Sequence, residues 1–335
     1  MTDAERLLIR APNWLGDAVM ALPALAAVRR AYPGRSIVLV ARLGVAPLFR
    51  EQSDAAPDEI LVVDERGEAG QLRAAHGNAV LLLPNSFRSA WLARLAGVGE
   101  RWGYRTSGRG WLLTRGARRP RGPLHQIRYY RELIRGIGID PGDDAIPRLR
   151  ARPATLDKAD ALLKLNGMSP GGERIVGFAP GAAYGTAKRW PPDRVAKVAE
   201  ALERRGARAV LVGAAGDRDT GRAIESALPA GTRIVNLIGR TSLAELIGVI
   251  ARCVAFVSND SGAMHVAAAL GVPLTAIFGP TDERVTAPAG PGTADVIVRD
   301  VFCRPCLLRE CPIDHRCMKR IDVDTVCQSV ISHLG

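Results

Sequence analysis

The sequence predicts an α/β protein with two similar domains, each built on a parallel β-sheet. Short apolar runs typical of strands alternate with helix-like segments along the chain. This alternation weakens near the middle of the sequence and then begins again. A chain of 335 residues is also longer than one hydrophobic core usually organises. We therefore expect two domains, residues 1–170 and 171–335, with a cleft between them.

The first half of the chain contains four strand-like runs and two helix-like runs. Apolar segments predict strands at residues 7–11, 37–41, 60–63 and 79–83. Helical periodicity predicts helices at residues 17–31 and 87–96. A weakly periodic segment rich in Pro, Gly and Arg follows at about residues 136–153, and it predicts an irregular connection.

The second half repeats the alternation, after a helix at residues 156–165 and a Gly-rich turn at 167–172 where we expect the domain boundary. Strands are predicted at residues 175–179, 209–212, 234–236, 254–257 and 274–278. Helices are predicted at residues 192–204, 217–227, 242–251, 263–270 and 323–334. Ser242 and Glu245 have the spacing of a capping box, which marks one of these helix starts.

The charge of the chain is strongly and unevenly basic. The formal net charge is +12, and nine arginines without an acidic residue lie between Arg101 and Arg131. This segment favours an anionic ligand or surface as a partner, and a solvated basic face without a ligand is the alternative. Nucleic acid is not the expected partner, because glycines and prolines interrupt the segment and no nucleic-acid-binding motif is present.

The sequence shows no recognisable membrane helix or signal peptide, so we expect a cytoplasmic protein. No apolar run reaches the roughly 18 residues that a membrane helix requires. Residues 18–28 have the length and apolarity of a signal-peptide core, but Asp17 precedes them and a strand-like run lies before it. A first strand, turn and helix explain this segment better.

The most informative motif is Ser258-Asn-Asp-Ser-Gly-Ala-Met-His265, which lies between a predicted strand and a predicted helix. A turn containing Asp260, Ser261 and Gly262 leaves free backbone N–H groups at the positive end of that helix, and such helix ends bind phosphate. His265 lies one turn into the helix, where its ring could reach a phosphate oxygen. The motif predicts a nucleotide-sugar site.

Asp17 and Lys188 lie in two other strand-to-helix connections, where ligands of parallel sheets bind. Asp17 either caps its helix or, if its pKa is raised, accepts a proton from a substrate. Thr186 offers a hydroxyl and Lys188 a compact positive charge in a loop of small residues that could wrap an anion, although a surface lysine is the commoner case. Asp217 and Asp219 favour helix capping or a ribose contact over a metal site.

A cysteine-rich segment near the end of the chain contains four of the six cysteines and His315. These four cysteines are Cys303, Cys306, Cys311 and Cys317. Their density fits a structural zinc or an iron–sulfur cluster. Disulfides, which a cytosolic setting disfavours, and reduced structural thiols are the alternatives.

Four motifs together resemble the bacterial lipopolysaccharide heptosyltransferases of glycosyltransferase family 9, in particular the members that add the second heptose. The motifs are Pro12-Asn-Trp-Leu-Gly-Asp17, Pro84-Asn-Ser-Phe-Arg88, Lys188-Arg-Trp-Pro191 and the turn beginning at Asn259. The cysteine-rich segment also fits, and the resemblance spans nearly the whole chain. It implies a GT-B fold, with an N-terminal acceptor domain and a C-terminal domain that binds ADP-heptose.

The resemblance also implies roles for individual residues. Asp17 would be the general base, and Lys188 would neutralise the departing diphosphate. The donor would contact Thr186, Asp217, Asp260, Ser261, Gly262 and His265, with Thr186 in place of a hydroxyl pair that is Ala182 and Ala183 here. The acceptor, heptosyl-Kdo-lipid A, would contact Asn13, Trp14, Arg88, Arg118 and Arg119. The family implies an inverting transfer without a catalytic cofactor, by a monomer at the inner membrane surface.

Three other functions compete with this assignment. A transferase of the same family could act on a different acceptor, by adding the first or the third heptose. A nucleotide-sugar epimerase would use two domains of the same kind without an acceptor. A basic protein that only binds polyanions would show no sugar transfer.

Overall fold

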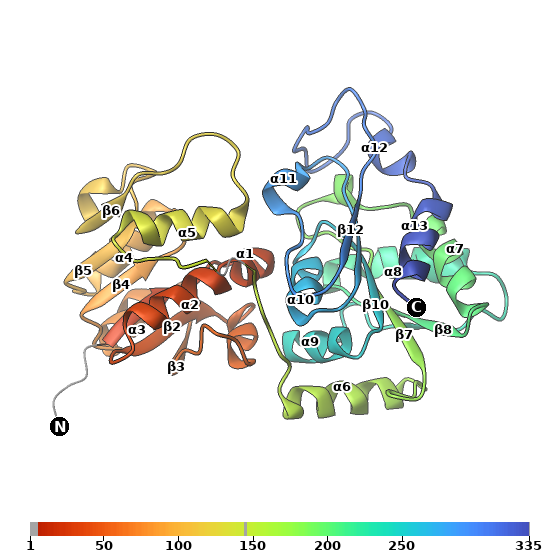
Figure 1. Ribbon diagram of the computed structural model, residues 1–335, viewed down its shortest axis with the longest axis horizontal. Helices are drawn as coiled ribbons and strands as arrows, with labels where there is room; N and C mark the ends of the chain where they lie inside the picture. Colours follow the sequence, from red (N-terminus) through yellow and green to blue (C-terminus); the bar gives the residue numbers. More distant parts are fainter. Residues whose placement is uncertain (1–5, 144–145, 335) are drawn as a thin grey trace. The chain divides into compact units, whose positions relative to one another are not determined.

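The computed structural model describes residues 6–143 and 146–334, and the chain divides into two compact units, Met1–Arg150 and Ala151–Gly335 (Figure 1). The division comes earlier than the expected boundary near residue 170. The reason is that helix α6 (Pro153–Leu165) packs along α9 (Leu243–Ala251) in the second unit. A side chain at Gly248 would place its Cβ 2.6 Å from the carbonyl oxygen of Thr155, so the two helices meet at this glycine.

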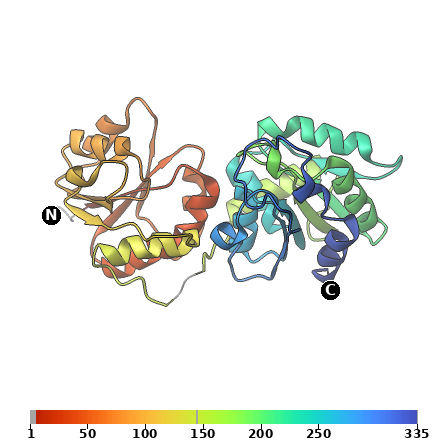
Figure 2. The same ribbon diagram turned by 90° about the horizontal axis from the view of Figure 1, so that it is seen from above.

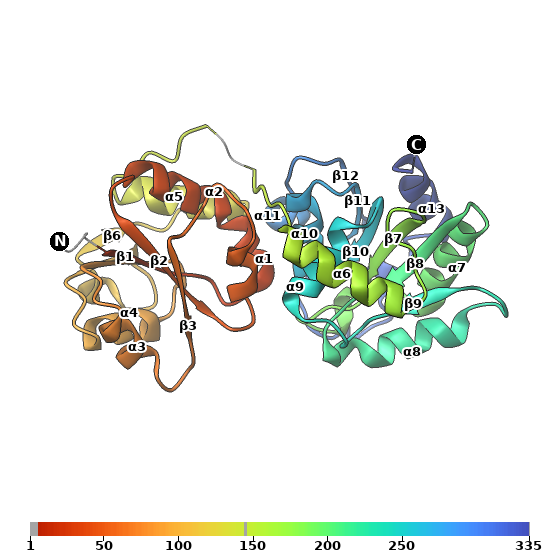
Figure 3. The ribbon, with the colours of Figure 1, turned by 90° about the horizontal axis from the view of Figure 1, so that it is seen from below.

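The first unit is built on a six-stranded sheet in which each observed strand pair is parallel. The strands in chain order are β1 (Arg6–Arg10), β2 (Ser36–Arg42), β3 (Glu59–Val63), β4 (Ala79–Leu82), β5 (Glu100–Tyr104) and β6 (Arg115–Ala117). Their order across the sheet is β3-β2-β1-β4-β5-β6. Helices α2 (Leu22–Ala31) and α5 (Gln126–Gly136) cover one face, and α3 (Glu68–Ala74) and α4 (Phe87–Leu95) cover the other (Figure 3).

The second unit also has a six-stranded parallel sheet with helices on both faces (Figure 2). Its strands are β7 (Arg174–Ala179), β8 (Ala207–Leu211), β9 (Ile234–Asn236), β10 (Ala255–Asn259), β11 (Leu274–Ile277) and β12 (Ala294–Ile297). The order is β12-β11-β10-β7-β8-β9. Besides α6 and α9, its main helices are α7 (Pro192–Glu203), α8 (Arg218–Ala227), α10 (Gly262–Leu270) and α13 (Val323–Ser332), with short α11 (Glu283–Thr286) and α12 (Arg316–Lys319).

The two sheets share one strand order, that of the dinucleotide-binding Rossmann fold. In each unit the order reverses between two central strands, β1 and β4 in the first and β7 and β10 in the second. Ligands of such sheets bind beyond the carboxyl ends of the strands at this reversal. The loops and first helical turns after these four strands carry Asp17, Arg88, Lys188 and Asp260.

Several elements differ from the sequence predictions. The predicted first helix is two helices, α1 (Leu15–Met20) and α2, because Pro23 in the first turn of α2 has no N–H to continue the hydrogen-bond ladder from α1. Helices α3 and α5 and strands β5, β6 and β12 were not predicted. The sheet-forming residues of β5 and β6 include arginine, glycine and glutamate, which give no apolar run.

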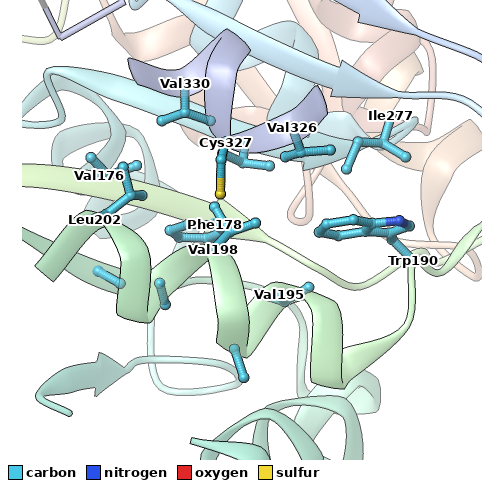
Figure 4. Close-up of a cluster of buried hydrophobic side chains, with 14 of the residues drawn as sticks. Val176, Phe178, Trp190, Val195, Val198, Leu202, Ile277, Val326, Cys327 and Val330 are labelled. Carbon is cyan, nitrogen blue, oxygen red and sulfur yellow. The ribbon is translucent and has the colours of Figure 1, made fainter. Parts of the chain in front are cut away.

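The core of the second unit anchors the loop that follows β7. Val176 and Phe178 of β7 pack between α7 and α13 in a buried apolar cluster that also contains Trp190 (Figure 4). The indole N–H of Trp190 donates to the carbonyl oxygen of Ile321 at 3.1 Å. The loop between β7 and α7 therefore ends on a fixed side chain, which restrains the residues just before it.

No helix within residues 6–143 and 146–334 is long and apolar enough to cross a membrane.

Candidate functional site

Lys188 and Asp260 form an ion pair at the strand-order reversal of the second unit. The Nζ of Lys188 donates to Oδ2 of Asp260 at 2.6 Å, and both side chains are largely buried. The Thr281 hydroxyl donates to the same carboxylate oxygen at 2.8 Å. Asn259 holds the two loops together, because its amide donates to the carbonyl oxygen of Pro180 at 2.6 Å. The site therefore presents an oriented lysine next to a fixed carboxylate.

Helix α10 begins directly after this carboxylate. Ser261 is the N-cap residue and has extended backbone angles, and the Ser261 hydroxyl lies 3.0 Å from that of Ser258. The first N–H groups of a helix have no partner within the helix, and they carry a partial positive charge. Gly262 is the first helical residue, and His265 is buried one turn further on. An anion at this helix end would meet both the helix N-terminus and the lysine.

Asp217 lies at the C-terminal end of a short 3-10 turn after β8 and is buried. Oδ1 of its carboxylate accepts a hydrogen bond from Arg189 at 3.0 Å, and Oδ2 accepts one from the N–H of Ala214 at 3.3 Å. Gly181 leaves room for this carboxylate, because a Cβ there would lie 2.1 Å from its Cγ. Asp217 therefore belongs to the same group of loops as Lys188 and Asp260.

The cysteine-rich segment packs on the loop that carries Lys188. The Tyr184 hydroxyl donates to the carbonyl oxygen of Leu307 at 2.8 Å, and the N–H of Ala187 donates to that of Arg309 at 2.9 Å. The Tyr184 ring lies 4.9 Å from Lys188 Nζ and 5.3 Å from the Arg309 guanidinium. This aromatic ring with two cations helps to fix the position of Lys188.

Asp17 lies in the first turn of α1, after β1 in the first unit. Burial raises its pKa from 3.8 to about 6, so the carboxyl group is a stronger proton acceptor than an ordinary aspartate. Burial also raises the pKa of Tyr130, and the charge of nearby Asp17 raises it further. Sequence analysis predicted that Asp17 could act as a general base only if its pKa were raised, and the structure meets that condition.

The side chains around this turn form a hydrogen-bonded network centred on the buried pair Arg10 and Glu68. Arg10 donates from Nε to Oε1 of Glu68 at 2.7 Å and from Nη2 to Oδ1 of Asn13 at 2.9 Å. Arg88 lies 3.5 Å from the other carboxylate oxygen of Glu68. The network orients Asn13 and Arg88 at the carboxyl ends of β1 and β4, while Trp14 is 61% exposed. Sequence analysis did not predict the roles of Arg10 and Glu68.

The arginine-rich segment divides into structural and exposed residues. Arg109 is fully buried and donates to the carbonyl oxygens of Tyr104 and Pro84 and to the Ser89 hydroxyl. Burial lowers the pKa of its guanidinium to about 10. Arg118 and Arg119 are exposed. Part of the basic segment thus stabilises the fold, and part faces solvent.

The sequence profile of glycosyltransferase family 9 (heptosyltransferase) matches residues 69–316. The chain belongs to this family. It is 33% identical to lipooligosaccharide heptosyltransferase 2 of Haemophilus influenzae, over 84% of this chain and 85% of that protein. It is 34% identical to lipopolysaccharide heptosyltransferase 2 of Escherichia coli, with the same coverage. The solved structure of Escherichia coli ADP-heptose lipopolysaccharide heptosyltransferase II superposes with a TM-score of 0.83 at 28% identity, covering 98% of each chain.

These findings confirm the predicted family, the glycosyltransferase class and the GT-B type of α/β fold. Within this family 9 chain, the structure brings the predicted donor residues together in the second unit. It adds roles for Tyr184, Arg189, Asn259 and Thr281. Arg189 and Asn259 lie within the predicted motifs, but no role was assigned to any of the four, because each role depends on contacts across loops. A strand-end asparagine before the Asp-Ser-Gly turn was the available signal for Asn259.

None of the four cysteines of residues 303–317 takes part in a disulfide. Burial raises the pKa of Cys317, and the other three thiols raise it further, so the four groups lie near one another. Among the described residues, however, no three His, Cys, Asp or Glu side chains converge in an arrangement that could hold a metal ion. Metal binding at this segment stays a prediction from the sequence.

Proposed function

We propose that this family 9 enzyme transfers heptose from ADP-heptose to the first heptose of the Kdo-lipid A inner core. The observation that carries the proposal is the Lys188–Asp260 pair at the N-terminus of α10, a site suited to a sugar diphosphate. The relatives that are 33% and 34% identical over 84% of the chain are named heptosyltransferase 2, which supports the same donor and acceptor. The reaction would take place in the cytoplasm, with the enzyme at the inner membrane surface.

The second unit would bind the donor. The diphosphate would accept hydrogen bonds from the backbone N–H of Gly262 and from Ser261 and His265, with Lys188 as the counter-charge. Thr186 is exposed in the same loop and would add a hydroxyl contact. Asp217, held by Arg189, would accept hydrogen bonds from the ribose hydroxyls. Asp260, held by Thr281, would contact the heptose hydroxyls.

The first unit would bind the acceptor and activate it. Asp17 would take the proton from an acceptor heptose hydroxyl as its oxygen forms a bond to the anomeric carbon. The bond from that carbon to the diphosphate oxygen breaks in the same step, and ADP leaves with the bonding electrons. Asn13, Trp14 and Arg88 at the same turn would position the acceptor, and the exposed Arg118 and Arg119 would meet its phosphates and carboxylates.

The proposal assigns leaving-group stabilisation to protein groups. ADP gains negative charge as the bond breaks, and a lysine with a helix N-terminus aimed at it stabilises that charge in the transition state. The loss of one such group typically lowers the rate about 10²–10³-fold. The loss of a general base lowers it about 10²–10⁴-fold.

The direct test supplies purified protein with ADP-heptose and each of three deacylated acceptors, and then determines product masses. The acceptors carry no heptose, one heptose or two heptoses on the Kdo core. One added heptose on the mono-heptosylated acceptor alone is the expected product. Transfer to the unheptosylated or the di-heptosylated acceptor would instead assign the first-heptose or third-heptose reaction.

Two results would contradict transferase function altogether. Conversion of ADP-heptose to an isomeric sugar without acceptor would indicate an epimerase. Tight binding of polyanions with no conversion of ADP-heptose would indicate a binding protein. The predicted monomer is tested in the same preparation by light scattering.

A structural metal at Cys303, Cys306, Cys311 and Cys317 is tested separately. Elemental analysis of protein purified without chelators should find about one zinc, or the iron of one cluster, per chain if the prediction is correct. Protein without stoichiometric metal would leave reduced thiols as the explanation, since a cytosolic setting disfavours disulfides.

A further inference from the structure

Helix α4 of the first unit has an unusual distribution of apolar side chains. Its small residues Ala90 and Ala93, with Ala96 just beyond it, are buried against the sheet. Phe87 and Trp91 are 41% and 39% exposed, and Leu95 is 47% exposed. These three residues are spaced four apart, so they form one stripe on the helix surface. The largest apolar side chains of α4 thus face outward. In a helix that only covers a sheet, such side chains face the sheet instead.

Trp111 extends this stripe from a neighbouring 3-10 turn, Gly110–Leu112. Its ring centroid lies 6.3 Å from that of Phe87, which in turn lies 6.3 Å from Trp91. Trp111 is 65% exposed. We call Phe87, Trp91, Leu95 and Trp111 the aromatic patch. Contiguous exposed apolar residues of this kind mark interaction sites rather than ordinary surface.

The aromatic patch is bordered by arginines. Arg94 is exposed on α4, and Arg73 of α3 donates to the carbonyl oxygen of Leu95 at 2.7 Å. Arg101 lies beside the turn that carries Trp111, because its Nε donates to the carbonyl oxygen of Leu112 at 2.7 Å. Arg88 adds less positive charge to the border of the patch, since the carboxylate of Glu68 is paired with it. Among residues 6–143 and 146–334, Arg73, Arg94 and Arg101 have no carboxylate within salt-bridge distance, so unpaired positive charges lie beside the aromatic patch.

We propose that the aromatic patch docks the enzyme on the surface of an anionic lipid bilayer. Tryptophan rings favour the boundary between headgroups and acyl chains, and neighbouring arginines are attracted to anionic headgroups. The proposal rests on the proposed function, since a lipid-linked acceptor lies in such a surface. It goes further by assigning the contact to α4 and the 110–112 turn, on the sheet face opposite α2 and α5 (Figure 3).

A second copy of the chain fits this surface less well. Pairing two such patches would bring the arginines of both copies together, and like charges oppose that contact. Four apolar side chains are also few beside the roughly 20–30 residues that each partner contributes to a stable protein interface. A bilayer needs only a few inserted side chains and supplies the opposite charge.

The test measures binding of the full chain to phosphatidylcholine vesicles with and without phosphatidylglycerol. Native protein should bind the anionic vesicles more tightly. The triple variant Trp91→Ser, Leu95→Ser, Trp111→Ser should lose about a hundredfold or more in that affinity. Leu165→Ser, which changes an 83% exposed leucine on α6 in the second unit, is the matched control and should bind as native protein does.

Arg94→Glu tests the electrostatic part of the proposal. It should lower the affinity for anionic vesicles by at least about fivefold and leave binding to neutral vesicles unchanged. Fluorescence quenching by lipids with brominated acyl chains gives a readout in native protein. Quenching should be strong and should fall when Trp91 or Trp111 is replaced by Phe. The other tryptophans are the same in every variant, and of these Trp102 and Trp190 are buried and Trp14 is exposed.

Equal vesicle binding by the native protein and the triple variant would overturn the docking proposal. So would a native dimer that the triple variant converts to a monomer, because the patch would then join two copies. Transfer to a deacylated acceptor in solution separates the two proposals. The native protein and the triple variant should transfer heptose equally there, and no transfer by either would contradict the proposed function instead.

Discussion

Asp17, the proposed general base, has a raised pKa that lowers the stability of the folded chain. Burial raises its pKa in the folded chain to about 6, against 3.8 for an exposed aspartate. The folded state therefore binds a proton more tightly than the unfolded state does. Stability is unaffected below pH 3.8, falls as the pH rises toward about 6, and stays reduced above it.

Asp17→Asn should therefore stabilise the first unit above pH 6 and have little effect below pH 3.8. The size of the gain should be about 3 kcal/mol or less, since each pKa unit corresponds to about 1.4 kcal/mol. Urea unfolding of native and variant protein at the two pH extremes measures it. A variant that is less stable than native protein above pH 6 would contradict the burial cause.

Lys188 carries the positive charge that the proposed mechanism places beside the departing diphosphate. Lys188→Met should lower kcat about 10²–10³-fold, because the positive charge beside the departing diphosphate is lost. Lys197→Met is the matched control, since Lys197 is an exposed lysine on α7 with only an exposed partner, Asp193, 3.9 Å away. Steady-state ADP release measures both. A loss below about tenfold for Lys188→Met would assign the leaving-group role elsewhere.

At the scale of elements, the loop between β7 and α7, which carries Lys188, is held from two sides. Trp190 fixes one end in the core of the second unit, and the cysteine-rich segment fixes the middle through Leu307 and Arg309. Gly185 is the point of closest approach. A Cβ there would lie 2.2 Å from the carbonyl oxygen of Arg309, and a backbone atom cannot move aside as a flexible side chain can.

Gly185→Ala should separate these two segments and loosen Lys188. We expect weaker ADP binding, by about tenfold or more, with little change in the unfolding midpoint of the core, since the clash is confined to surface loops. Calorimetric titration with ADP measures the affinity. Gly172→Ala is the control, because a Cβ there meets only ordinary contacts at 3.6 Å. Equal affinities would show that the contact does not position the lysine.

The sequence predicted most elements whose pattern is local. The strands ending at Arg10, Ala179 and Asn259 are apolar runs followed by turn residues, and they were predicted correctly to within about two residues. Strand β5 was missed because Trp102 and Tyr104 alternate with Arg101 and Gly103 rather than forming an apolar run. Its place in the sheet depends on pairing with β4, which is a tertiary contact.

The same distinction applies to the site. Motifs indicated Lys188, Asp260 and the α10 N-terminus, because charge and helix-start chemistry are visible in the sequence. They could not indicate the role of Thr281 or of Arg189, although Arg189 lies within one motif, because the hydrogen bonds of these residues to Asp260 and Asp217 join segments far apart in the chain. The raised pKa of Asp17 was also beyond the sequence, since it depends on burial.

At the scale of the whole molecule, the two units share one strand order but carry different chemistry. The first unit presents a buried carboxyl group with a raised pKa at its order reversal, and the second presents a lysine and a helix N-terminus. An inverting transfer needs both, a base for the attacking hydroxyl and a counter-charge for the leaving group. The central claim of the proposed mechanism is that the first unit supplies the base and the second unit supplies the counter-charge.

The most direct test is acceptor-dependent release of ADP from ADP-heptose, measured as kcat/KM at pH values on both sides of about 6 for native protein and Asp17→Asn. The native rate should rise with pH through an apparent pKa near 6, because the deprotonated Asp17 is the active form. The variant should be about 10²–10⁴-fold slower and should lack that rise. A variant that keeps the native rate and pH profile would contradict the account.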